Sequence, residues 1–338
     1  MNRFSYVRAT DVAQAAREAG APAAKIIAGG TNLVDLMKYD VERPGRLVDI
    51  TRLPGLRAIE DAADGGLRIG ALVTNTEVAY DRRVEARYPL LSSTILAGAT
   101  PQLRNSATTG GNLLQRTRCY YFYDVGTPCN KREPGTGCPA IPGVNRIHAV
   151  LGASEHCIAT HPSDMCVAMA ALEAVVRVSG PGGERAIPFA EFHRLPGDAP
   201  ERDTNLGRGE VVTAVELPAR GFPAHYTYLK LRDRHSYAFA LVSVAVGMEM
   251  DGGRIGEARF ALGGVAHKPW RDPEAEAMLR GQAASRDLFE RAAERTLRGA
   301  KGYGHNTFKI ELARRAIVRA LEQAAAGTPQ SQVDKRIR

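Results

Sequence analysis

The chain has 338 residues and a formal charge of +8, with 44% hydrophobic and 24% charged residues. Its length exceeds the roughly 250 to 300 residues at which one hydrophobic core stops growing, so we expect two or more domains. No apolar run approaches the ~20 residues that span a bilayer, and Lys and Arg are scattered among acidic residues, so we expect neither membrane insertion nor a nucleic-acid partner.

The positive charge suits an acidic partner or an anionic cofactor equally well. The N-terminal stretch MNRFSYVRATDVAQ offers no apolar segment of the secretory type, so we expect no signal peptide on this chain.

In chain order, residues 11–19 predict a short helix between a capping Thr10 or Asp11 and Gly20. Residues 25–28 predict a strand, which meets Gly29 and Gly30 before a helical run at 32–37.

Further strands are expected at 47–50 and 67–70, followed by a helix at 88–98. From 116 to about 156 the periodicity disappears, and an irregular stretch of this length usually has a function or is disordered. A helix starts at the HPSD segment, 161–164, and passes into a strand before a turn at 180–183. Residues 237–246 and 258–262 predict a hairpin around 251–253. The last helix is expected over 307–326, capped by Asn306 and stopped by Gly327, before a mobile tail at 328–338.

Two glycine pairs, Gly29-Gly30 and Gly110-Gly111, punctuate the first half of the chain. Without Cβ atoms, such turns can present main-chain N–H groups to anionic oxygens at close range. A single pair is more typical of a plain tight turn, but two pairs that each lead into a helix-like run favour a dinucleotide site. Neither pair matches G-x-G-x-x-G, so a nicotinamide site of the Rossmann type is not expected.

The irregular stretch contains most of the cysteines. Zinc usually takes close C-x2-4-C pairs, which are absent, while disulfides need an oxidising compartment during folding; unrelated buried thiols are a further alternative. An iron-sulfur cluster held by four thiolates is the interpretation we favour. Cationic residues in the same stretch would offset its negative charge: Arg116, Arg118, Lys131, Arg132 and Arg146. Cys166 sits in an apolar helical run and is expected to be a packing residue rather than a ligand.

Four segments resemble a known family: AGGTNLVDLMK (28–38), LRNSATTGGNL (103–113), ATHPSDM (159–165) and LKLRDRHSYAFALVSVAV (229–246). They are similar, in this order and over nearly the whole chain, to the FAD-binding subunit of molybdenum hydroxylases, the xanthine dehydrogenase and aldehyde oxidase superfamily. The cysteine-rich insertion resembles that of the medium subunit of bacterial periplasmic aldehyde oxidoreductase, which carries a 4Fe-4S cluster besides FAD. The flavin subunit of 4-hydroxybenzoyl-CoA reductase also has a cysteine-rich insertion, but its flanking segments match less well.

The resemblance implies an α+β fold with a PCMH-type FAD-binding domain, like that of vanillyl-alcohol oxidase, over 1–220, with the cysteine-rich loop at 116–158. A C-terminal domain of antiparallel sheet and helices, of the CO dehydrogenase flavoprotein type, is expected over 221–327. The resemblance also implies the FAD contacts Ile26, Ile27, Ala28, Gly29, Gly30, Thr31, Asn32, Leu33, Thr108, Gly110, Gly111, Asn112, Asp164 and Lys230. The expected 4Fe-4S ligands are Cys119, Cys129, Cys138 and Cys157.

The implied function is electron transfer from a molybdenum cofactor in a large partner subunit, through 2Fe-2S clusters of a small partner, to FAD and an external acceptor. No catalytic residue is expected on this chain. The chain would fold in the cytoplasm, and the resemblance suggests export of the heterotrimer to the periplasm through a signal on the small partner. Two rivals remain: a free-standing FAD oxidase of the vanillyl-alcohol type, with His161 or His148 linked to the flavin, and a zinc-organised binding module.

Overall fold

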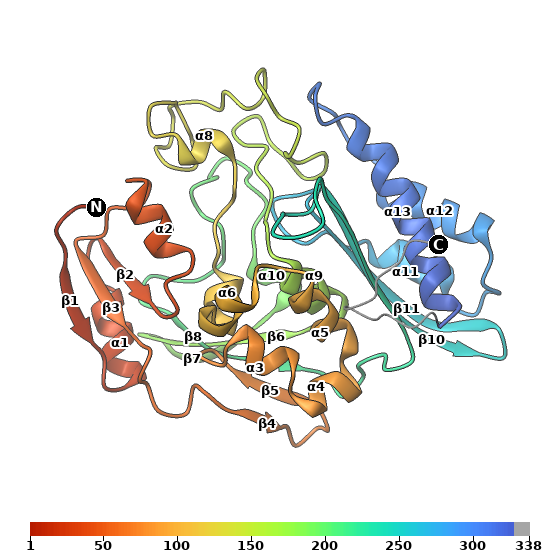
Figure 1. Ribbon diagram of the computed structural model, residues 1–338, viewed down its shortest axis with the longest axis horizontal. Helices are drawn as coiled ribbons and strands as arrows, with labels where there is room; N and C mark the ends of the chain where they lie inside the picture. The colour runs from red at the N-terminus through yellow and green to blue at the C-terminus, as the bar shows by residue number, and fades with distance from the viewer. Residues whose placement is uncertain (328–338) are drawn as a thin grey trace.

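Three separate β-sheets organise the chain and follow one another from the N-terminus to the C-terminus (Figure 1). The computed structural model describes residues 1–327, so the expected mobile tail lies outside the described residues. Runs of strands and runs of helices follow one another along the chain, which confirms the α+β expectation. Within the described residues, no helix is both long enough and apolar enough to cross a bilayer.

The first sheet is parallel and carries the first glycine pair. Its strands lie in the order β1 (Ser5–Arg8), β3 (Arg46–Asp49), β2 (Ala24–Ile27). Helix α1 (Val12–Ala19) connects β1 to β2, which lie on either side of β3, and it is capped by Asp11, whose side chain accepts a hydrogen bond from the N–H of Gln14. After β2 the chain passes through the glycines into α2 (Leu33–Lys38), which confirms the predicted order of strand, turn and helix.

The second sheet is antiparallel, with the strand order β4-β5-β8-β6-β7. Its strands are β4 (Ile59–Asp61), β5 (Leu67–Gly70), β6 (Val175–Gly180), β7 (Gly183–Pro188) and β8 (Val211–Leu217). The accompanying helices are α3 (Asn75–Ala79), α4 (Arg82–Arg87), α5 (Pro89–Leu96), α6 (Pro101–Ser106), α7 (Thr109–Leu113), α9 (Asp164–Ala171) and α10 (Phe189–Phe192). Helix α9 packs against α5 and also against the third sheet, so it joins the two halves of the chain.

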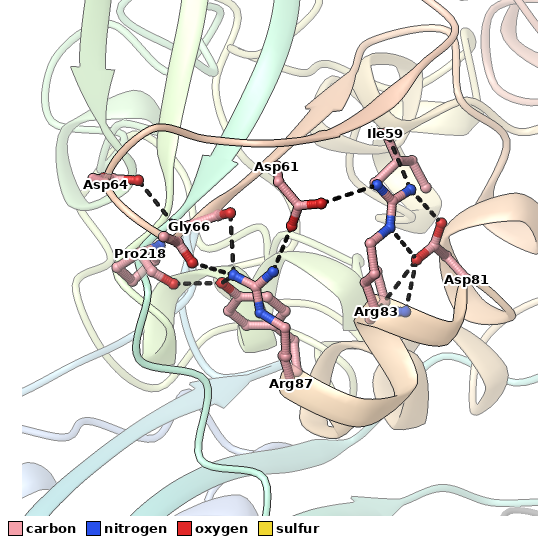
Figure 2. A network of polar contacts seen from close by, with 11 residues as sticks. Ile59, Asp61, Asp64, Gly66, Asp81, Arg83, Arg87 and Pro218 are labelled. Carbon is pink, nitrogen blue, oxygen red and sulfur yellow. Dashed lines mark hydrogen bonds and ion pairs between the residues drawn. The ribbon is translucent and has the colours of Figure 1, made fainter.

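A polar network fastens α4 to the edge of the second sheet (Figure 2). Arg87 donates to Asp61 over 2.7 Å, and Arg83 donates to the carbonyl oxygen of Ile59 over 2.9 Å. Asp81 caps α4 and pairs with Arg83 through both carboxylate oxygens. These charges are largely solvent-exposed, so they orient the helix more than they stabilise it.

The third sheet is an antiparallel meander covered by helices. It consists of β9 (His225–Leu231), β10 (Val242–Asp251) and β11 (Arg254–Gly263), with α11 (Pro273–Leu279), α12 (Arg286–Thr296) and α13 (Phe308–Ala325). The predicted hairpin is present, but the expectation that its first strand begins at residue 237 was wrong. Tyr237 has a φ of +50°, a left-handed conformation that a strand cannot contain, and β10 begins only at Val242.

The start of the last helix also differs from the prediction. The capping position of α13 is Thr307, not Asn306. Asn306 is fully buried and donates instead to the carbonyl oxygen of Ala149 over 2.9 Å, while its own oxygen accepts from the N–H of Tyr303. The amide therefore ties the cysteine-rich loop to the C-terminal helices.

The cysteine-rich loop, residues 116–158, contains one short helix, α8 (Tyr120–Tyr123), and is otherwise irregular as predicted. The loop nevertheless contributes an apolar side chain to a core. Phe122 is fully buried and forms a small core with Leu36 of α2 and with the loop's own cysteines. The loop packs against α2 in this way, and Figure 1 places α8 above α2 and on the far side from β4.

Candidate functional site

The two glycine segments, far apart in sequence, touch each other in the structure. A Cβ atom added to Gly29 would lie 1.9 Å from the carbonyl oxygen of Ser106, just before the second segment. The Ser106 hydroxyl donates to the carbonyl oxygen of Gly29 over 2.9 Å. Glycine is required at 29 because one backbone passes directly over the other, a reason the sequence did not reveal.

A cavity of about 480 Å³ opens where these segments meet. Its volume lies in the range typical of cofactor sites. One wall consists of the predicted residues Ile26, Ile27, Ala28, Gly29, Gly30, Thr31, Asn32 and Leu33, and another contains the predicted Thr108, Gly110 and Gly111. The remaining wall includes residues that we did not predict as contacts: Glu42, Arg116, His193 and Asp203.

The first segment offers unused hydrogen-bond donors to the cavity. The side-chain oxygen of Asn32 accepts from the N–H of Arg116 over 2.9 Å, which leaves the buried Nδ2 atom without a partner. The N–H groups of Gly30, Thr31 and Asn32 donate to no acceptor within residues 1–327. Buried donors without partners are costly, so this wall fits an anionic group such as the diphosphate of FAD.

The second segment does not work as predicted. Its glycines lie inside α7 rather than in a turn that precedes a helix. The N–H of Gly110 donates to the carbonyl oxygen of Ala71 over 2.9 Å, and that of Gly111 donates to the Thr108 hydroxyl over 3.2 Å. These N–H groups are already bonded, so we correct the expectation that they would cradle an anion. The segment instead provides a smooth wall and the hydroxyl group of Thr108.

Three predicted FAD contacts lie outside the cavity lining. Asn112 accepts a hydrogen bond from Ser163, the residue that caps α9, over 2.6 Å. Asp164 and Lys230 form a buried ion pair of 2.8 Å, with side chains 10% and 4% exposed, and Tyr228 also donates to Asp164. The structure thus brings α9 and β9 together through this pair. The roles of these three residues toward FAD stay predictions.

All four predicted cluster ligands line one small pocket in the cysteine-rich loop, together with Phe122, Lys131 and His148. Cys119, Cys129 and Cys157 are buried, Cys138 is half-buried, and none forms a disulfide. No three of the four sulfur atoms lie within 4.8 Å of one another. Among the described residues, only His161, Cys166 and His193 bring three possible metal-ligand atoms that close together. One tetrahedral zinc ion would need closer sulfurs, whereas a multinuclear cluster spans wider ones.

Burial in this pocket shifts the pKa values of two of its cysteines and of its histidine. Burial raises the pKa of Cys119 to about 12 and that of Cys157 to about 11. The bare thiols are therefore protonated at neutral pH, and metal binding must displace their protons. His148, which we considered only for flavin linkage, has its Nε2 atom 3.1 Å from the sulfur of Cys119. Burial lowers the pKa of His148 to about 4, so its ring is neutral.

Of the five cations expected to offset the cluster charge, only Lys131 lines the pocket. Arg118 and Arg146 pair with acidic residues, Asp35 and Asp233, and Arg132 donates to main-chain carbonyl groups. Arg116 lines the larger cavity. Cys166 lies outside the cysteine pocket, on α9, where its fully buried thiol packs in the core.

Comparison with known proteins matches both halves of the chain to family models. Residues 2–220 match the FAD binding domain in molybdopterin dehydrogenase, and residues 226–324 match the CO dehydrogenase flavoprotein C-terminal domain. The chain is 52% identical, over 96% of its length and 99% of the relative's, to the aldehyde oxidoreductase FAD-binding subunit PaoB of Escherichia coli K12. It is 27% identical to the glyceraldehyde dehydrogenase medium chain of Sulfolobus acidocaldarius, covering 86% of each chain.

Solved structures agree in fold. Carbon monoxide dehydrogenase from Hydrogenophaga pseudoflava aligns with a TM-score of 0.76 at 27% identity, covering 96% of this chain and 98% of that one. Quinoline 2-oxidoreductase from Pseudomonas putida 86 aligns with a TM-score of 0.73 at 27% identity and the same coverage. The likeness extends over both the FAD-binding half and the C-terminal half.

Proposed function

Because this chain belongs to the family of FAD-binding medium subunits of molybdenum hydroxylases, we propose that it is the electron-transfer subunit of an aldehyde oxidoreductase. Electrons from aldehyde oxidation at a molybdenum cofactor in a large partner would reach FAD on this chain through 2Fe-2S clusters of a small partner. An external acceptor would then take them from the flavin. The substrate does not touch this polypeptide, so the task of its residues is to hold and tune cofactors.

The observation that carries this proposal is the cavity between the two glycine segments. Its unused donors at Gly30, Thr31 and Asn32 fit a diphosphate, and its shape depends on the close crossing at Gly29. Bound FAD supplies the ability to accept electrons in pairs and to pass them on singly. The Asn32 amide and the neighbouring N–H groups would orient the diphosphate and replace the water that it loses on binding.

The second part of the proposal is a 4Fe-4S cluster held by Cys119, Cys129, Cys138 and Cys157. Four thiols that approach one pocket from an otherwise irregular loop support it. Such a cluster supplies single-electron transfer. The thiols would give up their protons to bind it, and Phe122 would keep water away from the buried side of the site.

The rival functions fit less well. Relatives of this chain are named medium chains or FAD-binding subunits of larger enzymes, which argues against a free-standing oxidase. Neither histidine proposed for a flavin link lines the cavity: His148 lies against Cys119, and the ring of His161 lies 4.3 Å from that of His193. We further propose a heterotrimer with one large and one small partner, which folds in the cytoplasm and is exported to the periplasm with a signal-bearing partner.

Metal analysis of the complex, co-expressed with its partners and purified intact, tests the cluster. We expect the Cys119→Ser, Cys129→Ser, Cys138→Ser and Cys157→Ser variants each to lose up to four iron atoms per complex, with the flavin content less affected. Cys166→Ser is the matched control, because this thiol is buried outside the pocket and should leave the iron content unchanged. Equal iron contents in all five variants and the wild type would overturn the assignment.

A further inference from the structure

A chain of charged side chains, one buried and three partly buried, joins the wall of the flavin cavity to the cysteine pocket. We call it the Asp203 network; its members are Lys131, Asp203, Arg116 and Glu42. Lys131 donates to one oxygen of Asp203 over 2.6 Å, and Arg116 donates to the other oxygen over 2.8 Å. A second nitrogen of Arg116 donates to Glu42 over 2.6 Å. The two cations thus share one carboxylate.

The members of the network face different sites. Lys131 lines the cysteine pocket, two residues after Cys129, whereas Arg116, Asp203 and Glu42 line the flavin cavity. The main-chain N–H of Arg116 also holds the oxygen of Asn32, the residue whose free amide points into that cavity. Asp203 therefore contacts one charged group on each side, Lys131 at the cysteine pocket and Arg116 at the flavin cavity.

Lys131 is buried and the other members of the network are partly buried, so water screens their charges less than those of exposed ion pairs. The Lys131 side chain is 1% exposed, that of Arg116 18% and that of Asp203 29%. Burial alone would raise the pKa of Asp203, but the charges of Lys131 and Arg116 hold it well below its usual range. The nearby ring of His267 has a pKa that burial lowers to about 4, so it adds no charge.

We propose that Asp203 is a positioning residue that couples the two redox sites, by holding the Lys131 ammonium against the cysteine pocket while it anchors Arg116 at the flavin cavity. This inference rests on the proposed function, because it requires the cluster. The Lys131 charge makes the cluster easier to reduce, and the Asp203 charge limits that effect. The carboxylate links the two sites because any displacement of Arg116 in the flavin cavity changes how Asp203 holds Lys131.

Opposite charges give the proposal a distinctive signature. Lys131→Met removes a positive charge near the cluster and should lower its midpoint potential, while Asp203→Asn removes a negative charge and should raise it. A roughly tenfold change in the reduction equilibrium, equivalent to about 59 mV for one electron, is the expected order in each direction. Asp203→Glu keeps the charge and should stay near the wild-type potential. A residue that only stabilised the fold would not shift the potential in opposite directions.

The test is a redox titration of the intact complex, followed by electron paramagnetic resonance. The signal of this cluster is identified as the one missing from the Cys157→Ser complex. Asp81→Asn is the matched control, because Asp81 also pairs with an arginine but lines neither site. If Lys131→Met fails to assemble, a raised potential in Asp203→Asn that Asp203→Glu restores still supports the proposal.

The possible failures are distinguishable. No cluster signal in the wild-type complex would overturn the proposed cluster and this inference together. A wild-type signal whose potential is unchanged in both charge variants, or moves in the same direction in both, would overturn only the inference. A shift of the same size in Asp81→Asn would also overturn it, because distant structural loosening would then explain the effect.

Discussion

Replacing Gly29 with alanine tests whether the flavin cavity depends on the close crossing of the two glycine segments. The added Cβ atom would lie 1.9 Å from the carbonyl oxygen of Ser106 and 2.8 Å from its carbonyl carbon. To restore even a tight contact of 3.0 Å to that oxygen, the segments must separate by about 1.1 Å. The hydrogen bond from Ser106 to residue 29 would be lost in the process.

The separation should weaken FAD binding more than it unfolds the chain. Overpacking of this kind costs about 1–3 kcal/mol. If that cost falls on the bound geometry, the affinity for FAD drops by about 5- to 140-fold. The assay is the ratio of flavin to protein absorbance after purification of the complex, followed by titration of the depleted complex with FAD.

Two controls separate a specific effect from general destabilisation. Gly182→Ala has no atom within 4 Å of the new Cβ and should behave like the wild type. Gly221→Ala creates a clash of similar severity, 1.8 Å from the carbonyl oxygen of Arg87, but away from the cavity lining. It should lower the melting temperature and keep the flavin. Full flavin retention by Gly29→Ala, or equal flavin loss in Gly221→Ala, would refute the reasoning.

Three further predictions follow from buried polar groups. Burial lowers the pKa of Lys309 to about 7 from 10.5, so the unfolded chain binds more protons than the folded chain between these pH values, and the free energy of unfolding should rise from pH 7 to 10. Urea unfolding of Lys309→Met should lack that rise. A pH profile identical to that of the wild type would contradict the prediction. Lys230→Met leaves the Asp164 carboxylate without its cation and should lower the free energy of unfolding, measured by chemical denaturation, by about 3–5 kcal/mol. Adding Asp164→Asn should restore part of this loss, and purely additive effects of the two changes would disprove the coupling. Asn32→Asp would place a carboxylate beside the diphosphate, and because like charges repel, the flavin content of this variant should fall well below that of Asn32→Ala. Equal flavin contents in the two variants would argue against the diphosphate site.

Local patterns allowed the sequence to predict the elements around the site. The β-type run before Gly29 and the amphipathic segment after it specify β2 and α2 without long-range information. The four cysteines could be grouped because they occur in one stretch that lacks any other reason to be ordered. The structure places all four in the lining of one pocket, while their joint role as cluster ligands stays a prediction.

Long-range pairings were outside the reach of this reasoning. Asp203 lies in a polar loop with no periodicity, and its partners at 116 and 131 are far away in the chain, so nothing local indicates that it pairs with two cations. Lys230 and Asp164 were chosen separately as flavin contacts, yet their closest charged neighbours are each other. The glycine pairs misled for a related reason: a missing Cβ at Gly29 or Gly110 accommodates a protein neighbour, which sequence alone cannot distinguish from a ligand.

The central claim is that this chain holds a flavin and an iron-sulfur cluster side by side. A density map of the purified holo-complex, with anomalous scattering recorded at the iron edge, tests it most directly. We expect the diphosphate against Asn32 between the two glycine segments, and one compact group of iron atoms bonded to Cys119, Cys129, Cys138 and Cys157. Flavin density elsewhere, or these cysteines bound to a single zinc ion or joined in pairs, would contradict the account.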